Sequence, residues 1–188
     1  MTEKEMLAKL KKALKPKRYV HSLGVSSTAV KLAEKFNVDT DKARIAGMLH
    51  DCAKCIDSDE QIKLCEKYNI PLSDITLECP AVIHAPLGAA VAKAEYGIED
   101  DEILRSIALH TTGGKNMSKL DKIIYIADMI EPSRDYKGVD DLRKIAMSNL
   151  DEAMLEALQS TLKFNIKKES LVHPDTIDAW NDLLLNNK

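Results

Sequence analysis

Four of the five histidines in the chain recur at intervals that suit a bundle of helices. They are His21, His50, His84 and His110, which stand 29, 34 and 26 residues apart. Each interval has room for a helix, a connection and a returning helix, so successive imidazoles come back to one level of the bundle. The spacing therefore predicts that the four side chains meet at one site.

Two aspartates lie in surroundings that disfavour a free carboxylate. Asp51 follows His50 at the end of an apolar run, and Asp128 interrupts the apolar segment 123–130. A carboxylate buried among apolar residues is costly unless it is paired or bound to a metal. His110 also ends an apolar run. These polar intrusions indicate a shared site rather than separate surface groups.

The ligand set formed by four neutral imidazoles and two carboxylates has a definite metal preference. It suits Fe, Mn, Co, Ni or Zn, because Mg and Ca prefer shells made only of oxygen.

The adjacent pair His50 and Asp51 makes a prediction about the backbone. Neighbouring side chains of a regular helix point about 100° apart. Both can reach one metal only if the chain leaves regular helical geometry there. We therefore expect an irregularity at residues 50–52.

The elements that must position these residues are predicted to be helices. The chain has only 7 Gly and 6 Pro, and its apolar residues recur at helical spacing, with almost no alternating strand pattern. We expect an all-α fold of about nine helices. The expected starts are capped by Asp39, Asp57, Asp100, Ser118 and Asp175.

Composition and charge exclude several classes of protein. The 188 residues are 45% hydrophobic and carry a net charge of -3, with 27 Lys plus Arg against 30 Asp plus Glu. This composition permits a packed core, and no apolar stretch approaches the roughly 20 residues of a membrane span. No basic block suits a nucleic acid duplex, and the acidic N-terminus does not resemble a secretory signal. We expect a cytoplasmic protein.

The four cysteines are open to two interpretations. Cys52, Cys55, Cys65 and Cys79 fall within 28 residues, and the first two form a C-x-x-C. A structural zinc or a redox pair is one interpretation. Reduced, buried thiols are the favoured one, because Cys65 and Cys79 do not form a second tight pair.

Five local strings stand in order along the chain. They are Arg18-Tyr-Val-His21, His50-Asp-Cys-Ala-Lys54, His84-Ala-Pro86, Leu109-His-Thr-Thr-Gly113 and Ala127-Asp-Met-Ile-Glu-Pro-Ser-Arg134. Together they resemble the HD-domain metal phosphohydrolase superfamily. Within it they are similar to the YqeK family, bacterial symmetrical hydrolases of diadenosine tetraphosphate. The resemblance covers about residues 16–180.

The resemblance implies a fold, an activity and a metal. The fold would be one HD-domain helical bundle over 1–188, with a metal-binding core at about 16–135 and C-terminal helices at about 136–188 packed on it. The activity would split dinucleoside tetraphosphates into two nucleoside diphosphates, with hydroxide attacking phosphorus in line and no Ser or Cys nucleophile. Two divalent ions would exceed the two ligand charges, so the site would attract phosphate and lower the pKa of a bound water. The cofactors would be two metals, with iron first among those that suit the ligands. His21, His50, Asp51 and Asp128 would hold one ion and His84 and His110 the other, with Asp51 as the bridge.

The resemblance also implies roles toward the nucleotide. Lys54 and Arg134 would neutralise phosphate and serve catalysis together with Asp51. Backbone groups at Thr111 and Gly113 would approach phosphate, and His173 and Thr176 would border the nucleoside. The implied substrate contacts are completed by His21, His84, His110 and Asp128.

Other functions remain open from the sequence alone. The same ligands would suit hydrolysis of a nucleoside mono- or triphosphate, a cyclic dinucleotide or a guanosine polyphosphate. They would also suit a diiron oxygenase, although Lys54 and Arg134 argue for phosphate, and a noncatalytic HD module would have no reason to keep the ligands. A homodimer could form through the helix that contains Met6 and Leu14.

Overall fold

The computed structural model describes residues 1–186 and confirms an all-α fold. These residues form eleven α-helices and one 3-10 turn, with no strand among them, so the expected number of about nine was too low. The elements are α1 (Glu3–Ala13), α2 (Pro16–Phe36), α3 (Thr40–Leu49), α4 (Ser58–Lys67), α5 (Asp74–Glu78), η1 (Pro80–Val82), α6 (His84–Tyr96), α7 (Asp101–Leu109), α8 (Lys119–Ile130), α9 (Val139–Ala146), α10 (Leu150–Lys167) and α11 (Pro174–Asn186).

Most of the expected helix starts are confirmed by side-chain caps. The Asp39 carboxylate accepts from the amides of Asp41 and Lys42 at 2.8 and 3.0 Å, and Ser118 forms a capping box with Asp121 at the start of α8. The Asp175 cap was wrong, because α11 already begins at Pro174. Proline is favoured at the first helical position, because the amide N–H that it lacks would have no partner within the helix there.

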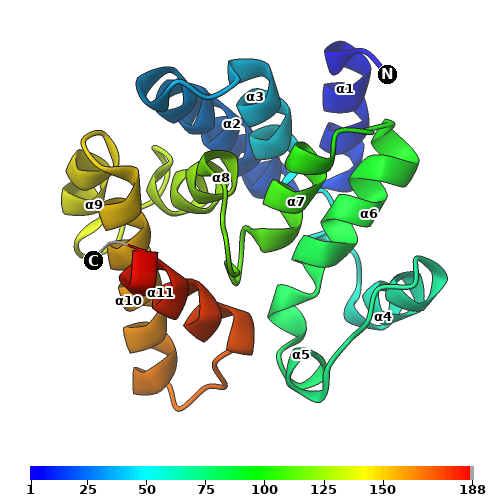
Figure 1. The fold of residues 1–188 in the computed structure, drawn as a ribbon. Helices are drawn as coiled ribbons and strands as arrows, with labels where there is room; N and C mark the ends of the chain where they lie inside the picture. Colours follow the sequence, from blue (N-terminus) through cyan, green and yellow to red (C-terminus); the bar gives the residue numbers. More distant parts are fainter. Residues whose placement is uncertain (187–188) are drawn as a thin grey trace.

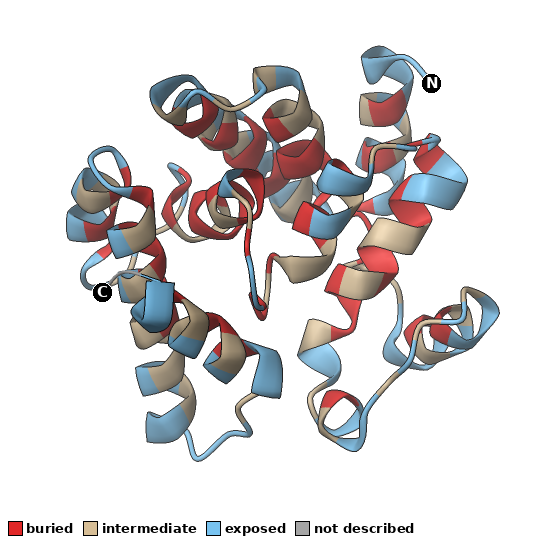
Figure 2. Ribbon diagram, viewed as in Figure 1, coloured by how far each residue is buried: buried red, intermediate tan, exposed pale blue. Residues whose placement is uncertain are grey.

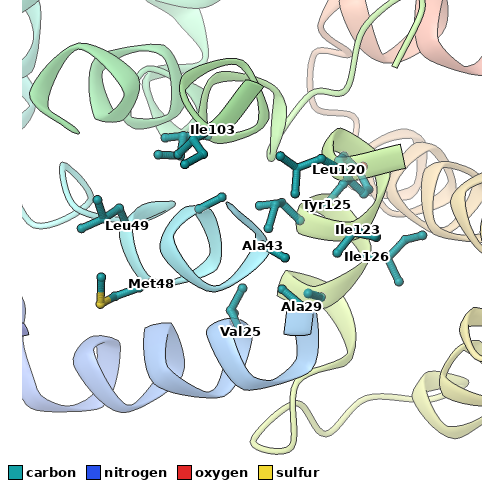
Figure 3. Packing of buried hydrophobic residues seen from close by; sticks show 14 of the residues in the cluster. Val25, Ala29, Ala43, Met48, Leu49, Ile103, Leu120, Ile123, Tyr125 and Ile126 are labelled. Carbon is teal, nitrogen blue, oxygen red and sulfur yellow. The ribbon is translucent and has the colours of Figure 1, made fainter. Parts of the chain in front are cut away.

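Four helices form the centre of the molecule. Figure 1 shows α2, α3, α7 and α8 between a group made of α9, α10 and α11 and a group made of α4, α5 and α6. The buried surfaces gather on these central helices, whereas the outer ends are exposed (Figure 2). Figure 3 shows α3 lying between Val25 of α2 and Ile103 of α7, with α8 alongside.

A glycine allows α2 and α3 to approach closely. A Cβ added to Gly47 would lie 2.8 Å from the Cα atom of Ser26, closer than real Cβ contacts come. Any larger residue would push the two helices apart. Because His21 lies on α2 and His50 directly follows α3, Gly47 helps to set the distance between these two imidazoles.

The C-terminal helices pack on the core through α10. Met154 and Leu158 of α10 are fully buried, and α10 contacts α8, α9 and α11. The division into a core and an extension stays a prediction, and the last two residues of that extension lie outside the described range. Met6 and Leu10 of α1 and Leu14 directly after it are buried within the chain, and a homodimer through this segment stays a prediction. None of the described helices has the length and hydrophobicity needed to cross a membrane.

Candidate metal centre

The structure brings together all six residues that the sequence analysis assigned to a metal site. They come from separate elements: His21 from α2, the pair His50 and Asp51 from the turn after α3, His84 from the start of α6, His110 from the end of α7 and Asp128 from α8. All are buried except Asp128, whose side chain keeps 20% of its exposure. Helix packing therefore converts the regular spacing in sequence into one cluster.

The cluster contains two ligand groups. In the first, His21 Nε2 lies 2.9 Å from Asp128 Oδ1 and 3.3 Å from His50 Nε2. In the second, His84 Nε2 lies 3.1 Å from His110 Nε2. Several ligand atoms at such distances form the kind of set that a cation holds together.

Asp51 is shared by the two groups through its two oxygens. Its Oδ2 lies 3.3 Å from His50 Nε2 and 3.7 Å from His21 Nε2. Its Oδ1 lies 3.1 Å from His84 Nε2 and 3.6 Å from His110 Nε2. A carboxylate with one oxygen in each group has the geometry of a bridge between two ions.

Hydrogen bonds to the other ring nitrogens orient all four imidazoles. The Nδ1 atoms of His50, His84 and His110 lie 2.7 to 2.8 Å from the carbonyl oxygen three residues earlier in each case. His21 Nδ1 instead lies 3.0 Å from a carboxylate oxygen of Glu131. Each Nδ1–H can donate to its acceptor, which leaves every Nε2 lone pair free for a metal. The donor set therefore fits a pair of divalent transition metals.

The expected backbone irregularity follows α3 directly. Helix α3 ends at Leu49, and residues 50–55 form turns in which the Cys52 amide donates to Leu49 O and the Lys54 amide to Asp51 O, both at 2.9 Å. These i to i−3 bonds tighten the chain relative to an α-helix. The neighbouring side chains of His50 and Asp51 can thus point into the same cluster.

The electrostatics of the cluster favour ionised carboxylates and a neutral His84. Burial would raise the pKa of Asp51, but the facing imidazoles hold it well below its usual range. Burial likewise opposes ionisation of Asp128, while His21 and Arg134 hold its pKa low. Burial lowers the pKa of His84 to about 4 despite its contact with Asp51. Anionic carboxylates and a neutral imidazole are the protonation states that bind metals.

A cleft of about 750 Å³ opens beside His21. Its walls come from the start of α2, from the turn after Asp51 and from the loop after α8. Five cationic side chains line it, against two carboxylates. The lining consists of Lys15, Lys17, Arg18, His21, Lys54, Cys55, Glu131, Ser133, Arg134, Asp135 and Tyr136.

Comparison with known protein families decides the affiliation. Residues 18–133 match the family model described as HD domain. This chain belongs to the HD domain family. The matched range contains all six clustered ligand residues, so the resemblance inferred from the five strings is confirmed at the level of this family.

Full-length relatives of this HD-domain chain carry a more specific description. It is 39% identical over 184 residues to a Bacillus subtilis protein named bis(5'-nucleosyl)-tetraphosphatase, symmetrical, with 98% of both chains covered. A Staphylococcus aureus protein of the same name is 42% identical over 173 residues, which cover 91% of this chain and 89% of that one.

A solved structure shares the whole HD-domain fold. It is a Clostridium acetobutylicum protein described as a predicted HD superfamily hydrolase involved in NAD metabolism. It is 45% identical and has a TM-score of 0.97, with 99% of this chain and 98% of that chain covered. This similarity confirms the predicted helical bundle, including the packing of its C-terminal helices.

Lys54 and Arg134 both lie at the edge of the HD-domain cluster. Lys54 Nζ lies 3.1 Å from His84 Nδ1, and burial lowers the pKa of its ammonium group. Arg134 donates from Nε to the backbone oxygen of Asp128 at 2.7 Å and also hydrogen-bonds its carboxylate. Arg134 therefore holds a candidate ligand as well as facing the cleft.

Two residues of the HD-domain site escaped the sequence reasoning as individual functional groups. Arg18 donates from Nη1 to Asp51 Oδ2 at 2.8 Å. Glu131 accepts a hydrogen bond from His21 Nδ1 and another, at 2.7 Å, from the Ser133 amide. The absence of a side chain on Gly24 makes room for the Glu131 carboxylate. Their signal was positional: Arg18 stands three residues before His21, and Glu131 three residues after Asp128, on the same helical faces.

The four residues expected to approach phosphate or nucleoside do not line the cleft beside His21. His173 Nε2 lies 3.1 Å from Thr76 Oγ1, and Thr176 is buried at the start of α11. The Gly113 amide already donates to Leu109 O at 2.8 Å, so it is not free for phosphate. The Thr111 hydroxyl is buried without a hydrogen-bond partner in the described structure. Contacts of these residues with substrate stay predictions.

The cysteines do not add to the ligand groups. Cys52 and Cys65 are buried, and the Cys52 thiol donates to Gly88 O at 3.3 Å. Burial raises the pKa of Cys52 well above that of a free thiol, so it stays protonated. Among the described residues, no cysteine belongs to a group of three that could hold a metal. The observations favour reduced thiols over a zinc site.

Proposed function

We propose that this protein hydrolyses dinucleoside tetraphosphates, such as diadenosine tetraphosphate, symmetrically into two nucleoside diphosphates. The observation that carries the proposal is the pair of ligand groups joined by Asp51 beneath a cationic cleft. The names of the Bacillus subtilis and Staphylococcus aureus relatives supply the substrate class. A phosphohydrolase needs such a centre, because positioning and charge neutralisation carry most of phosphoryl transfer.

The proposed cofactors are two divalent transition metals, with iron as the expected native ion. His21, His50, Asp51 and Asp128 would hold the first, and Asp51, His84 and His110 the second. When bound, such ions supply Lewis acidity toward phosphate oxygens and water. In the reaction, the oxygen of water bonds to phosphorus, the bridging P–O bond breaks, and one nucleoside diphosphate leaves with its oxygen while a proton is released.

The protein's own cations would stabilise the charge that develops on the phosphate. Lys54 and Arg134 both line the cleft, which supports the catalytic roles proposed for them with Asp51. Arg18 adds a third charge next to Asp51. Hydrogen bonds from charged donors are about twice as strong as neutral ones, so these groups favour a polyphosphate over a neutral ester.

The decisive experiment is metal analysis followed by a nucleotide panel with product identification. Protein purified without oxygen should contain about two metal ions per chain and convert diadenosine tetraphosphate to ADP alone. Asp51→Ala is the inactive control. Formation of ATP plus AMP would contradict symmetrical cleavage, and absence of hydrolysis at full metal content would contradict the function. Absence of oxygen consumption would exclude an oxygenase.

A further inference from the structure

We propose that the cleft beside His21 binds the leaving nucleoside diphosphate, with Lys15, Lys17 and Arg18 contacting its phosphates and Tyr136 its base. The inference rests on the proposed tetraphosphate substrate. It assigns the cleft to one half of that substrate, and it makes these four residues determinants of specificity.

Symmetrical cleavage requires two binding arms, one on each side of the attacked phosphorus. The C-terminal segment expected to border a nucleoside lies by the His84 and His110 end. A Cβ on Gly113, which follows His110, would lie 3.0 Å from Ala179 Cβ of α11. His173 hydrogen-bonds Thr76 of α5, and α5 packs on the η1 turn that directly precedes His84. The second half of the substrate needs a different place.

The cleft beside His21 has the size and position for that second half. Its volume of about 750 Å³ lies within the range of roughly 300 to 1,000 Å³ that small-molecule pockets occupy. His21 forms part of its floor, whereas His84, His110 and the C-terminal segment do not line it. A chain of phosphates held at the metal cluster would therefore enter the cleft from its His21 end.

The charge of the cleft suits a diphosphate. Lys15 and Lys17 are exposed on the cleft wall, and neither forms an ion pair with any residue from 1 to 186 within 4.0 Å. Of the two lining carboxylates, Glu131 is occupied by His21 and the Ser133 amide. The lysines thus present uncompensated positive charge beside the path of the phosphate chain, which lowers the energy of an anion there.

Arg18 links the cleft to the metal cluster. Its Nη1 donates to Asp51 Oδ2, and its Nε and Nη2 make no hydrogen bond within the described chain. Its side chain retains 33% of its exposure. The guanidinium is thus fixed at one corner while its other donors remain free, and such a planar fork suits phosphate.

Tyr136 offers a fixed aromatic surface on the loop wall. The residue is half-buried, and its hydroxyl donates to the backbone oxygen of Met129 at 3.1 Å, which restrains the ring. Stacking on an aromatic ring strengthens the binding of a base by roughly 5- to 150-fold, whatever the base. We therefore expect Tyr136 to stack on a nucleobase without strong discrimination among bases.

The first test compares Lys15→Gln/Lys17→Gln with the matched control Lys11→Gln/Lys12→Gln. The control removes the same charge from exposed lysines in the last turn of α1, outside the cleft. With metal-loaded protein, the cleft variant should raise KM for diadenosine tetraphosphate by up to about 25-fold, since an exposed ion pair contributes up to about fivefold and two are lost. Metal content should stay unchanged. An equal rise in both variants, or in neither, would overturn the phosphate subsite.

The second test separates the base from the phosphates. Tyr136→Ala should lower kcat/KM for diadenosine tetraphosphate at least about fivefold, the lower limit for base stacking. It should change cleavage of adenosine 5'-tetraphosphate less, because that substrate lacks the second nucleoside. Tyr136→Phe keeps the ring and should resemble wild type. Equal losses on both substrates would overturn the role of Tyr136 toward the base.

The two levels of inference fail differently. If wild-type protein does not cleave diadenosine tetraphosphate, the proposed function is wrong. If it cleaves this substrate and both sets of variants behave like wild type, the function stands and the assignment of the cleft is wrong.

Discussion

The two ends of the metal centre are held in different ways. At the His84 and His110 end, each imidazole is oriented by a backbone carbonyl three residues earlier, Ala81 O or Ile107 O. At the His21 end, side chains hold two of the ligands: Glu131 holds His21, and Arg134 holds Asp128, whereas His50 is again oriented by a carbonyl, Gly47 O. The first end is buried, whereas the second borders the cleft.

This difference shows where the chain can vary its chemistry. A carbonyl at i−3 is present in any helical turn, so the His84 and His110 end depends mainly on the fold. The His21 end depends on Glu131, Ser133 and Arg134, which all belong to the loop after α8. That loop also supplies the cleft wall. At this end the residues that orient the ligands therefore also line the cleft, whereas the His84 end meets the cleft through Lys54, whose Nζ lies 3.1 Å from His84 Nδ1.

The largest effect is expected where the two ends meet. Asp51→Ala removes one oxygen from each ligand group, so both metals should be lost together. Activity should fall by at least roughly 1,000-fold, because more is lost than a single transition-state donor. Metal analysis and steady-state kinetics measure both quantities, with circular dichroism as the check on folding. Retention of both metals would contradict the bridge.

Substitution of one imidazole should separate the ends. His84→Ala is expected to deplete mainly the metal shared with His110, because the four ligands of the other group remain. We expect about one metal per chain and roughly a 100-fold loss of kcat, the scale of one strong electrostatic contribution. Full activity with a single metal would show that a mononuclear centre suffices.

A smaller effect should appear at the side-chain-held end alone. Glu131→Gln weakens the acceptor that orients His21, and outer partners of metal ligands contribute about 10- to 100-fold to affinity. Metal titration should show this loss for one of the two ions only. Asp135→Asn is a matched control on the same loop, and it should leave both affinities unchanged. Equal weakening of both ions would contradict the independence of the two ends.

The same contrast explains what the sequence could predict. The imidazole spacing and the intrusion of Asp128 into an apolar segment identified five of the six clustered residues, because buried polar groups stand out against apolar neighbours. Asp51 came from its adjacency to His50 in the pair that the family resemblance uses. The adjacency of His50 and Asp51 predicted the turn after α3. Arg18 and Glu131 could not be singled out, since a charged residue on a helix usually faces water. Only packing reveals that they point toward the cluster.

The number of helices also could not be predicted correctly from the sequence pattern. The η1 turn carries too few residues for a clear period, and neighbouring caps can merge or separate short helices. The start of α11 was misplaced because an aspartate near a proline suggested the cap, whereas the proline itself begins the helix. The site was more predictable than these elements because its residues are chemically distinctive.

The smallest effect is expected from residues that belong to neither end. Cys65→Ala and Cys79→Ala should leave metal content and kcat/KM within about twofold of wild type, because neither thiol joins a ligand group among the described residues.

Cys65 is fully buried, so its replacement leaves a small cavity, whereas Cys79 is only half-buried. Removal of the buried Cys65 sulfur should lower the free energy of unfolding by about 1 kcal/mol. This loss would lower Tm by roughly 2 to 4 °C in a chain of this size. Cys79→Ala is thus the control with a smaller shift. Loss of a bound zinc from either variant would instead revive the structural metal site, which would add a third metal-holding region to the two ends compared above.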